Sequence, residues 1–256
     1  MGEYINAVLL PSLTNQSSQI LTQLPLPATV TDFWRLVTQY NVSLIAAFEL
    51  DSDDPTIGAY IPSGSGVPLQ CGPFEIKITS GQSNELWEET VLLALKQKKR
   101  KPSLTTSSLR TQEHRVTHLK CTKCDFDPGN ILTFIQKLRS HRQNDKSRIL
   151  FMCRNGALYS GLVCVLTLLL DRINTDHQVS IPLAVGTVKT IRPQVIPTLD
   201  QYRTLYQALN LYCETDNTYS NCADVTSNTK QAVETGVTNT AFVDNDNNSE
   251  NVYANF

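Results

Sequence analysis

The sequence predicts one α/β domain followed by a tail of different composition. Its 256 residues are enough for a domain of ordinary size with a sizeable core. Short apolar runs with the length of strands alternate with segments whose apolar residues recur at helical spacing. After Cys213 the chain is rich in Asn, Thr and Asp and poor in large apolar groups. We therefore expect a folded domain over residues 1–213 and a disordered tail over residues 214–256.

The first half of the chain contains several strand patterns and one helix pattern. A helix is expected through Phe33, Trp34 and Val37, with Thr29 or Thr31 at its N-cap. Residues 51–66 are rich in Asp, Ser, Gly and Pro and read as a loop. Strands are expected over Tyr4–Leu10, Val42–Phe48, Phe74–Thr79 and Trp87–Leu95.

In the second half of the chain, strand and helix patterns are easier to distinguish. Arg148–Met152 has the bulky apolar residues of a buried strand, and Cys153 stands at its C-terminal end. Gly161–Ile173 is apolar nearly all round, which indicates a core helix. Thr198 and Gln201 have the spacing of a capping box at the start of a last helix. Two further helices are expected around Ile131–Leu138 and from Ile181 to near Arg192.

Charge and hydropathy exclude several classes of protein. The formal net charge of −2 does not favour nucleic acid or an anionic membrane as partner. The longest apolar run, Leu162–Leu170, is too short to cross a bilayer. No basic segment followed by an apolar one opens the chain, so we expect no signal peptide. Seven scattered cysteines are typical of reduced thiols in the cytoplasm.

Two other features have competing interpretations. The basic run 96–101 is either a solvated hairpin tip, which we favour, or a patch for localisation or polyanion binding. Cys121 and Cys124 have the spacing of zinc ligands, with His118 close by. A single such pair is weak support for a metal site, and we expect no metal.

The end of the buried strand carries the most specific chemical signal. Cys153 is followed by a short glycine-containing turn and then by the apolar helix. In such an arrangement, backbone N–H groups and the helix dipole point into one concavity that suits a phosphate or a thiolate. The same field lowers the pKa of a cysteine and makes it nucleophilic.

Residues 152–161, Met-Cys-Arg-Asn-Gly-Ala-Leu-Tyr-Ser-Gly, resemble the phosphate-binding loop of the protein tyrosine phosphatases. That family reads His-Cys-x-x-Gly-x-Gly-Arg-Ser/Thr-Gly. Further segments match the family in order and spacing. They are Tyr-Ile-Asn-Ala at 4–7, Gln-Leu-Pro-Leu-Pro at 23–27, Asp-Phe-Trp-Arg at 32–35, Tyr-Ile-Pro at 60–62, Arg-Pro at 192–193 and Gln-Tyr at 201–202.

The resemblance implies a highly twisted mixed sheet flanked by helices, here without the N-terminal helices of the family. It places Cys153 at the nucleophile and Gln201 at the remaining glutamine of the closing motif. The first glutamine of that motif, which positions the hydrolytic water in the family, is replaced by Pro197. Asp125 or Asp127 could serve as a degenerate general acid, although the Trp-Pro-Asp motif is missing. The phosphate-binding loop comprises Arg154, Asn155, Gly156, Ala157, Leu158, Tyr159 and Ser160.

Tyr159 stands where the family has the arginine that forks onto phosphate oxygens. A phenol cannot form those two charge-assisted hydrogen bonds, so we expect an inactive domain. The pattern resembles the membrane-distal second domain of receptor-type phosphatases, which implies a pseudophosphatase acting in regulation and protein contacts. The alternatives are a weak phosphatase with a Cys153 phosphocysteine intermediate, or a trap that binds phosphotyrosine without turnover.

The resemblance implies no cofactor, and protein partners such as a neighbouring phosphatase domain or a phosphotyrosine protein. The chain would then be cytoplasmic, or the intracellular part of a membrane receptor. Tyr253 in the tail is followed two residues later by Asn255. Once phosphorylated, such a tyrosine resembles a ligand of SH2 domains.

Overall fold

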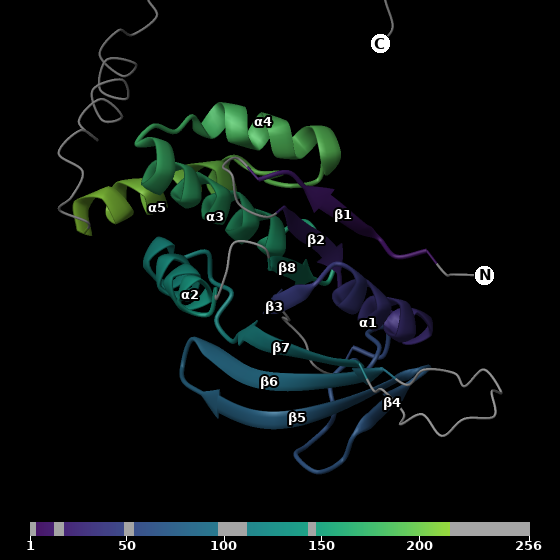
Figure 1. Ribbon diagram of the computed structural model, residues 1–256. Coiled ribbons are helices and arrows are strands. Elements are labelled where there is room, and N and C mark those ends of the chain that lie inside the picture. The colour runs from purple at the N-terminus through teal and green to yellow at the C-terminus, as the bar shows by residue number, and fades with distance from the viewer. Residues whose placement is uncertain (1–3, 13–17, 49–53, 97–111, 143–146, 216–256) are drawn as a thin grey trace, which may run out of the picture. The chain divides into compact units, whose positions relative to one another are not determined.

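The computed structural model describes residues 4–12, 18–48, 54–96, 112–142 and 147–215 (Figure 1). Contacts divide the chain into a compact unit, Met1–Tyr212, and a second unit that begins at Cys213. The fold below is that of the first unit. The basic run beyond Lys96, the tail beyond Thr215 and Tyr253 lie outside the described residues.

The centre of the fold is one mixed sheet of eight strands in the order β1-β2-β8-β3-β7-β6-β5-β4. The strands β2, β8, β3 and β7 are mutually parallel, and the remaining pairs are antiparallel. This confirms the mixed sheet that the sequence predicts. The strands are β1 (Ala7–Leu10), β2 (Gln19–Gln23), β3 (Val42–Phe48), β4 (Leu69–Cys71), β5 (Phe74–Ser83), β6 (Trp87–Lys96), β7 (Gln112–Cys121) and β8 (Arg148–Cys153).

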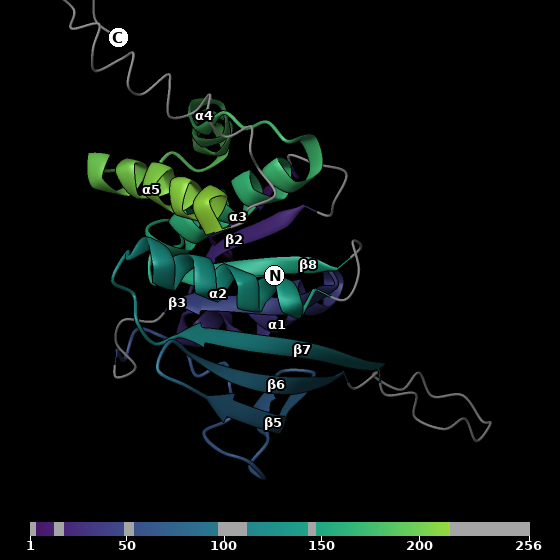
Figure 2. The ribbon, with the colours of Figure 1, turned by 90° about the vertical axis from the view of Figure 1, so that its left-hand side faces the viewer.

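Helices flank both faces of this sheet, with α1 on one side and α2 and α3 on the other (Figures 1 and 2). The helix α3 contacts β2, β3 and β8, and α4 lies against α3 and β1. The helices are η1 (Pro27–Thr29), α1 (Val30–Gln39), α2 (Pro128–Ser140), α3 (Tyr159–Asp176), α4 (Ile181–Ile191) and α5 (Leu199–Thr215).

The core under α1 follows from the spacing of its apolar residues. Phe33, Trp34 and Val37 are fully buried in one cluster with alternate residues of the central strands, such as Ile45 and Leu150. The Trp34 indole N–H donates to the carbonyl of Tyr60 at 3.0 Å, so its polar atom is satisfied. Burying each such side chain stabilises the fold by about 1.5–3 kcal/mol.

The sequence pattern missed three strands, β2, β4 and β7. The strand β7 reads Gln-Glu-His-Arg-Val-Thr-His-Leu-Lys-Cys and exposes its first residues, so no apolar run marks it. It is ordered by pairing with β6 on one side and β3 on the other. Such pairing is a tertiary effect that overrides weak local preference.

Other expected boundaries moved by a few residues. The first strand begins at Ala7, and the core helix begins at Tyr159 and ends at Asp176. Thr29 is the N-cap residue of α1, but its hydroxyl accepts from the Leu26 amide and caps the preceding turn instead. At α5 the amide of Gln201 donates to the Thr198 hydroxyl at 3.3 Å, one half of the expected capping box.

Candidate functional site

The loop between β8 and α3 packs against the end of the sheet. Cys153 ends β8 in register with Gln23 of β2 and Phe48 of β3. Gly156 has φ +65°, and a Cβ there would lie 2.6 Å from the backbone carbon of Thr22. Only glycine fits this turn, because the loop runs directly over the backbone of β2.

Cys153 itself is buried, with only 2% of its surface exposed. Its sulfur lies 2.9 Å from the Ser160 hydroxyl oxygen in the first turn of α3. Its thiol also donates to Oδ1 of Asn155 at 3.3 Å. The cysteine and serine of the predicted site are therefore together, as the sequence motif indicates.

The amides of the loop converge on a side chain of the loop itself. The backbone N–H groups of Ala157 and Leu158 both donate to Oδ1 of Asn155, each at 3.0 Å. With the Cys153 thiol, this oxygen has three donors around it. It therefore competes with any anion that would accept the same hydrogen bonds from the loop amides. Sequence reasoning missed this, although asparagine is a preferred residue in turns where its side chain accepts from a following amide.

Two arginines lie close to the loop, and both have other partners. The Arg154 guanidinium is 67% exposed and pairs with the Asp54 carboxylate at 2.6 Å. Arg192 is buried and donates to the carbonyls of Gly156 at 3.2 Å and Asn155 at 3.0 Å, and to the Asn6 side chain. Arg192 thus binds carbonyls of the loop, whereas amides of the loop donate to the Asn155 side chain.

The side chain at the family's arginine position stacks on another aromatic ring. Tyr159 and Phe126 lie with ring centroids 4.3 Å apart and planes 7° from parallel. Burial raises the pKa of the Tyr159 phenol, and the nearby Cys124, Cys153 and Asp125 raise it further. The phenol is therefore neutral, and it supplies no positive charge to the loop.

The two candidate acids have structural roles. Asp127 is the N-cap of α2, and its Oδ1 accepts from the Asn130 amide at 2.9 Å. Burial alone would raise the pKa of Asp125, but hydrogen bonds from the Asp127 amide, Lys123 and Asn130 outweigh it and lower that pKa. Asp125 is therefore ionised at neutral pH, whereas a general acid must carry its proton.

Gln201 is buried at the start of α5, where its backbone amide donates a hydrogen bond to the Thr198 hydroxyl. Within the described residues its Oε1 has no hydrogen-bond partner.

His118 does not form a metal site with Cys121 and Cys124. Its Nε2 instead lies 3.0 Å from the Tyr60 hydroxyl in the core. The described residues include no cluster of three His, Cys, Asp or Glu side chains able to hold a metal ion.

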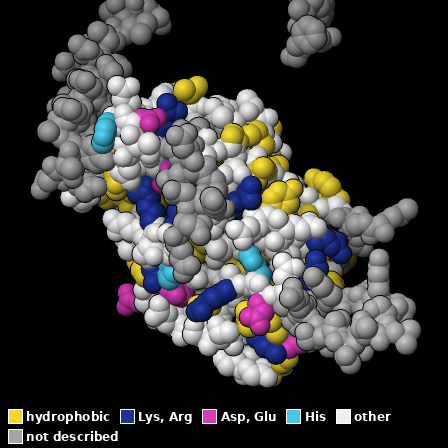
Figure 3. Space-filling view, in the orientation of Figure 1, with side chains coloured by type: hydrophobic (Ala, Val, Ile, Leu, Met, Phe, Trp, Pro, Cys, Tyr) yellow, Lys and Arg dark blue, Asp and Glu magenta, His cyan; other side chains and the backbone are white. Residues whose placement is uncertain are grey.

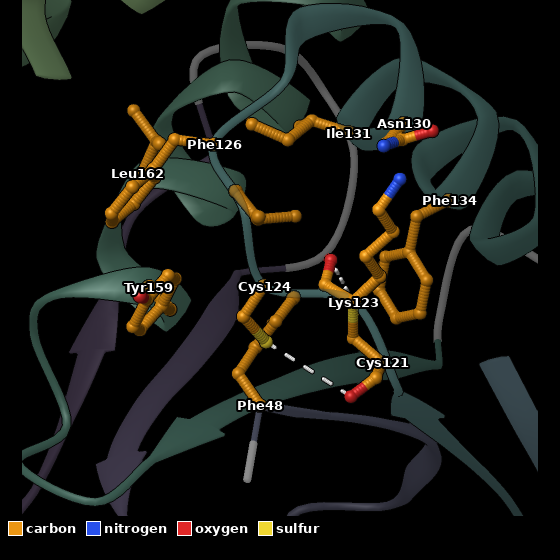
Figure 4. A pocket seen from close by; sticks show the side chains of 11 residues that line it. Phe48, Cys121, Lys123, Cys124, Phe126, Asn130, Ile131, Phe134, Tyr159 and Leu162 are labelled. Atoms are coloured by element: carbon orange, nitrogen blue, oxygen red, sulfur yellow. Dashed lines mark hydrogen bonds between the residues drawn. The ribbon is translucent and has the colours of Figure 1, made fainter. Parts of the chain in front are cut away.

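Beside the loop lies a small cavity of about 20 Å³ (Figure 4). Its walls are mostly aromatic and aliphatic, with two thiols and Lys123 and Asn130 among them. The principal lining residues are Phe48, Cys121, Cys124, Phe126, Phe134 and Tyr159.

Comparison with known proteins supports the resemblance. The family model for protein-tyrosine phosphatases matches residues 1–211. The chain belongs to the protein-tyrosine phosphatase family. Within this phosphatase-family domain, Cys153 and Ser160 keep the family's cysteine and hydroxyl positions, whereas Tyr159 replaces its arginine.

Curated relatives include receptor-type tyrosine-protein phosphatases. The chain is 27% identical over 218 residues to receptor-type tyrosine-protein phosphatase U of Gallus gallus, covering 83% of this chain and 15% of the relative. It is 26% identical over 219 residues to receptor-type tyrosine-protein phosphatase C of Homo sapiens, covering 81% of this chain and 16% of the relative. The chain therefore spans about a sixth of the length of these relatives.

The fold has solved counterparts. The catalytic domain of human protein tyrosine phosphatase non-receptor type 18 superposes with a TM-score of 0.67 at 22% identity. The match covers 80% of this chain and 72% of that domain. At this identity the likeness shows the fold, which is the phosphatase fold predicted from the sequence.

None of the described helices is long and apolar enough to span a membrane.

Proposed function

We propose that this domain is a pseudophosphatase that regulates receptor signalling through protein–protein contacts. The observation that carries the proposal is the Asn155 oxygen, which already accepts the hydrogen bonds of the loop amides and the Cys153 thiol. A phosphate would have to displace it and then bind without a guanidinium.

The missing guanidinium weakens both substrate binding and the chemical step. Phosphoryl transfer spreads negative charge over oxygens that need fixed positive partners. Arg154 pairs with Asp54, and Arg192 donates to carbonyls of the loop. Loss of such contacts typically reduces a rate by about three orders of magnitude or more.

Protonation of the leaving group is compromised as well. A tyrosyl leaving group needs a proton donor, but Asp125 is held in its ionised form and Asp127 caps α2. Because phosphate binding and proton donation are both altered, we expect this site to catalyse hydrolysis poorly.

A role in protein contacts is supported by the surface. Apolar side chains gather over α4 and β1 in Figure 3. The large exposed apolar residues on these two elements are Leu9, Leu183 and Ile191. Exposed apolar groups that lie near one another are typical of partner-binding surfaces. The partners we propose are a neighbouring phosphatase domain or a phosphotyrosine protein, with an SH2 domain at phosphorylated Tyr253, in the cytoplasm.

The alternative is a weak phosphatase that forms a phosphocysteine at Cys153. It is favoured by one observation, the intact 2.9 Å contact between Cys153 and Ser160. To decide between the two, the purified chain and its Cys153→Ser variant are incubated with p-nitrophenyl phosphate. Circular dichroism confirms that both proteins are folded.

We expect the wild-type chain to release p-nitrophenol no faster than the Cys153→Ser variant. A wild-type rate at least about tenfold above that of the serine variant would establish the phosphatase and overturn the proposal. The serine variant is the matched control because it changes only the nucleophilic atom, and it keeps the size of the side chain.

A further inference from the structure

The loop between β7 and α2 carries two thiols that interact. Cys121 is the last residue of β7, and its thiol donates to the carbonyl of Lys123 at 3.3 Å. The Cys124 sulfur lies 4.0 Å from the carbonyl oxygen of Cys121 (Figure 4). Both cysteines line the same small cavity.

The two thiols differ in acidity. A hydrogen bond from the Cys124 thiol lowers the pKa of Cys121, even though burial opposes this effect. The pKa of Cys124 is raised by the same hydrogen bond, by burial and by the neighbouring charges of Cys121 and Cys153. Cys121 is thus the thiol that ionises first, and Cys124 is the hydrogen-bond donor beside it.

The surroundings of this pair differ from those of the other buried cysteines. Burial alone raises the pKa of Cys71 to about 11, and burial also raises that of Cys164. Neither has a second thiol as hydrogen-bond partner among the interactions that shift its pKa. These two cysteines are therefore expected to be unreactive and serve as internal references.

The cavity leaves space for a small molecule beside the pair. Its volume of about 20 Å³ exceeds the roughly 10–15 Å³ that one water molecule needs. Cys124 is half-buried, whereas Cys121 is buried. The apolar walls formed by Phe48, Phe126 and Phe134 disfavour charged reagents.

We propose that Cys121 and Cys124 are an oxidisable dithiol, a modification site that hydrogen peroxide converts to a disulfide. The Cys121 thiolate attacks one peroxide oxygen, the O–O bond breaks, and sulfenic acid forms while the departing hydroxide takes up the proton that the thiol had released and becomes water. The Cys124 sulfur then attacks the sulfenic sulfur, the S–O bond breaks, and the hydroxyl leaves as a second water with the Cys124 proton. Two thiols are oxidised by two electrons, and one peroxide is reduced.

The site adjoins the loop of Cys153 without being part of it. Phe126 follows the dithiol by two residues, and its ring stacks on Tyr159. A disulfide would therefore fix the segment that holds this aromatic stack. The inference does not depend on whether Cys153 is catalytic.

The test uses the whole chain, treated with a small molar excess of hydrogen peroxide and then alkylated in denaturant. Trypsin cuts after Lys120, Lys123 and Lys137, so it separates Cys121 from Cys124. A disulfide keeps the peptide 121–123 attached to the peptide 124–137, and mass spectrometry detects the joined pair. Cys124→Ser is the test variant, and Cys71→Ser is the matched control for a cysteine outside the site.

We expect the wild-type chain to lose two of its seven thiols and to yield the joined peptides, which reductant separates. The Cys71→Ser control should also lose two thiols, whereas Cys124→Ser should lose none to a disulfide. A disulfide from Cys124 to Cys153, or oxidation of Cys71 and Cys164 as fast as that of Cys121, would overturn the proposal. Retention of all seven thiols in peroxide would overturn it equally.

Discussion

At the residue scale, Asn155 serves stability at the expense of anion binding. Its Oδ1 accepts from the amides of Ala157 and Leu158, which precede Tyr159, the first residue of α3. Such an Asx turn stabilises the loop locally. The same two amides are donors that a phosphate oxygen would need. A single side chain therefore stabilises the empty loop and competes with any ligand.

A second single-residue effect is the pH response of His118. It is buried, and burial, with the positive charge of Lys120, lowers its pKa to about 3. Its unfolded pKa is about 6.5, so between pH 6.5 and 3 the unfolded state binds the extra proton. Stability is therefore full above pH 6.5 and falls as the pH falls through this window. Between pH 7.5 and 5 the loss should be about 2 kcal/mol.

The measurement for His118 is urea unfolding of the wild type and of His118→Gln at pH 7.5 and pH 5. Glutamine keeps a hydrogen-bonding group near the Tyr60 hydroxyl but does not titrate. The variant should lose less stability than the wild type between the two pH values. An equal loss in both proteins would show that His118 does not cause the pH dependence.

At the element scale, the loop between β7 and α2 has become a structural connection. Lys123 and Asn130 bind Asp125, and Asp127 caps α2. Phe126, with φ +57°, lies between them and stacks on Tyr159. A backbone in this region is unusual for a phenylalanine and is maintained by the surrounding contacts. The loop thus closes against Tyr159 through its own packing.

The cap of α2 gives a direct test of that structural role. Asp127→Ala removes the acceptor of the Asn130 amide and should destabilise the domain by about 1 kcal/mol. Thermal unfolding should show this as a decrease in Tm of roughly 2–4 °C. Asp127→Asn is the matched control, because asparagine caps helices about as well as aspartate. If the alanine variant melts with the wild type, Asp127 does not stabilise α2.

At the scale of the whole molecule, the sequence predicted the order of elements that builds the loop. The apolar run before Cys153 and the apolar helix after it are strong local signals, and both are confirmed as β8 and α3. The strand β7 escaped prediction because its pairing partners, not its composition, order it. Motifs spread over the domain indicated the family, because they can be recognised in the sequence from their order and spacing alone.

The interactions that define the site were beyond reach of the sequence. Phe126 and Tyr159 are far apart in the chain, and only the fold brings their rings together. The pairing of Arg154 with Asp54 depends on a loop whose path no periodicity describes. The role of Asn155 depends on backbone directions within a turn of a few residues. The sequence therefore identified the altered residues, and the structure supplied what they contact.

The occupied loop is tested most directly by calorimetric titration with tungstate, a tetrahedral oxyanion like phosphate. We expect no saturable heat with the wild-type chain up to about millimolar tungstate, a limit near −4 kcal/mol of binding free energy. The Asn155→Ala variant frees the amides of Ala157 and Leu158 and should bind. Saturable binding by the wild type, as tight as that of Asn155→Ala, would contradict the conclusion that Asn155 fills the loop.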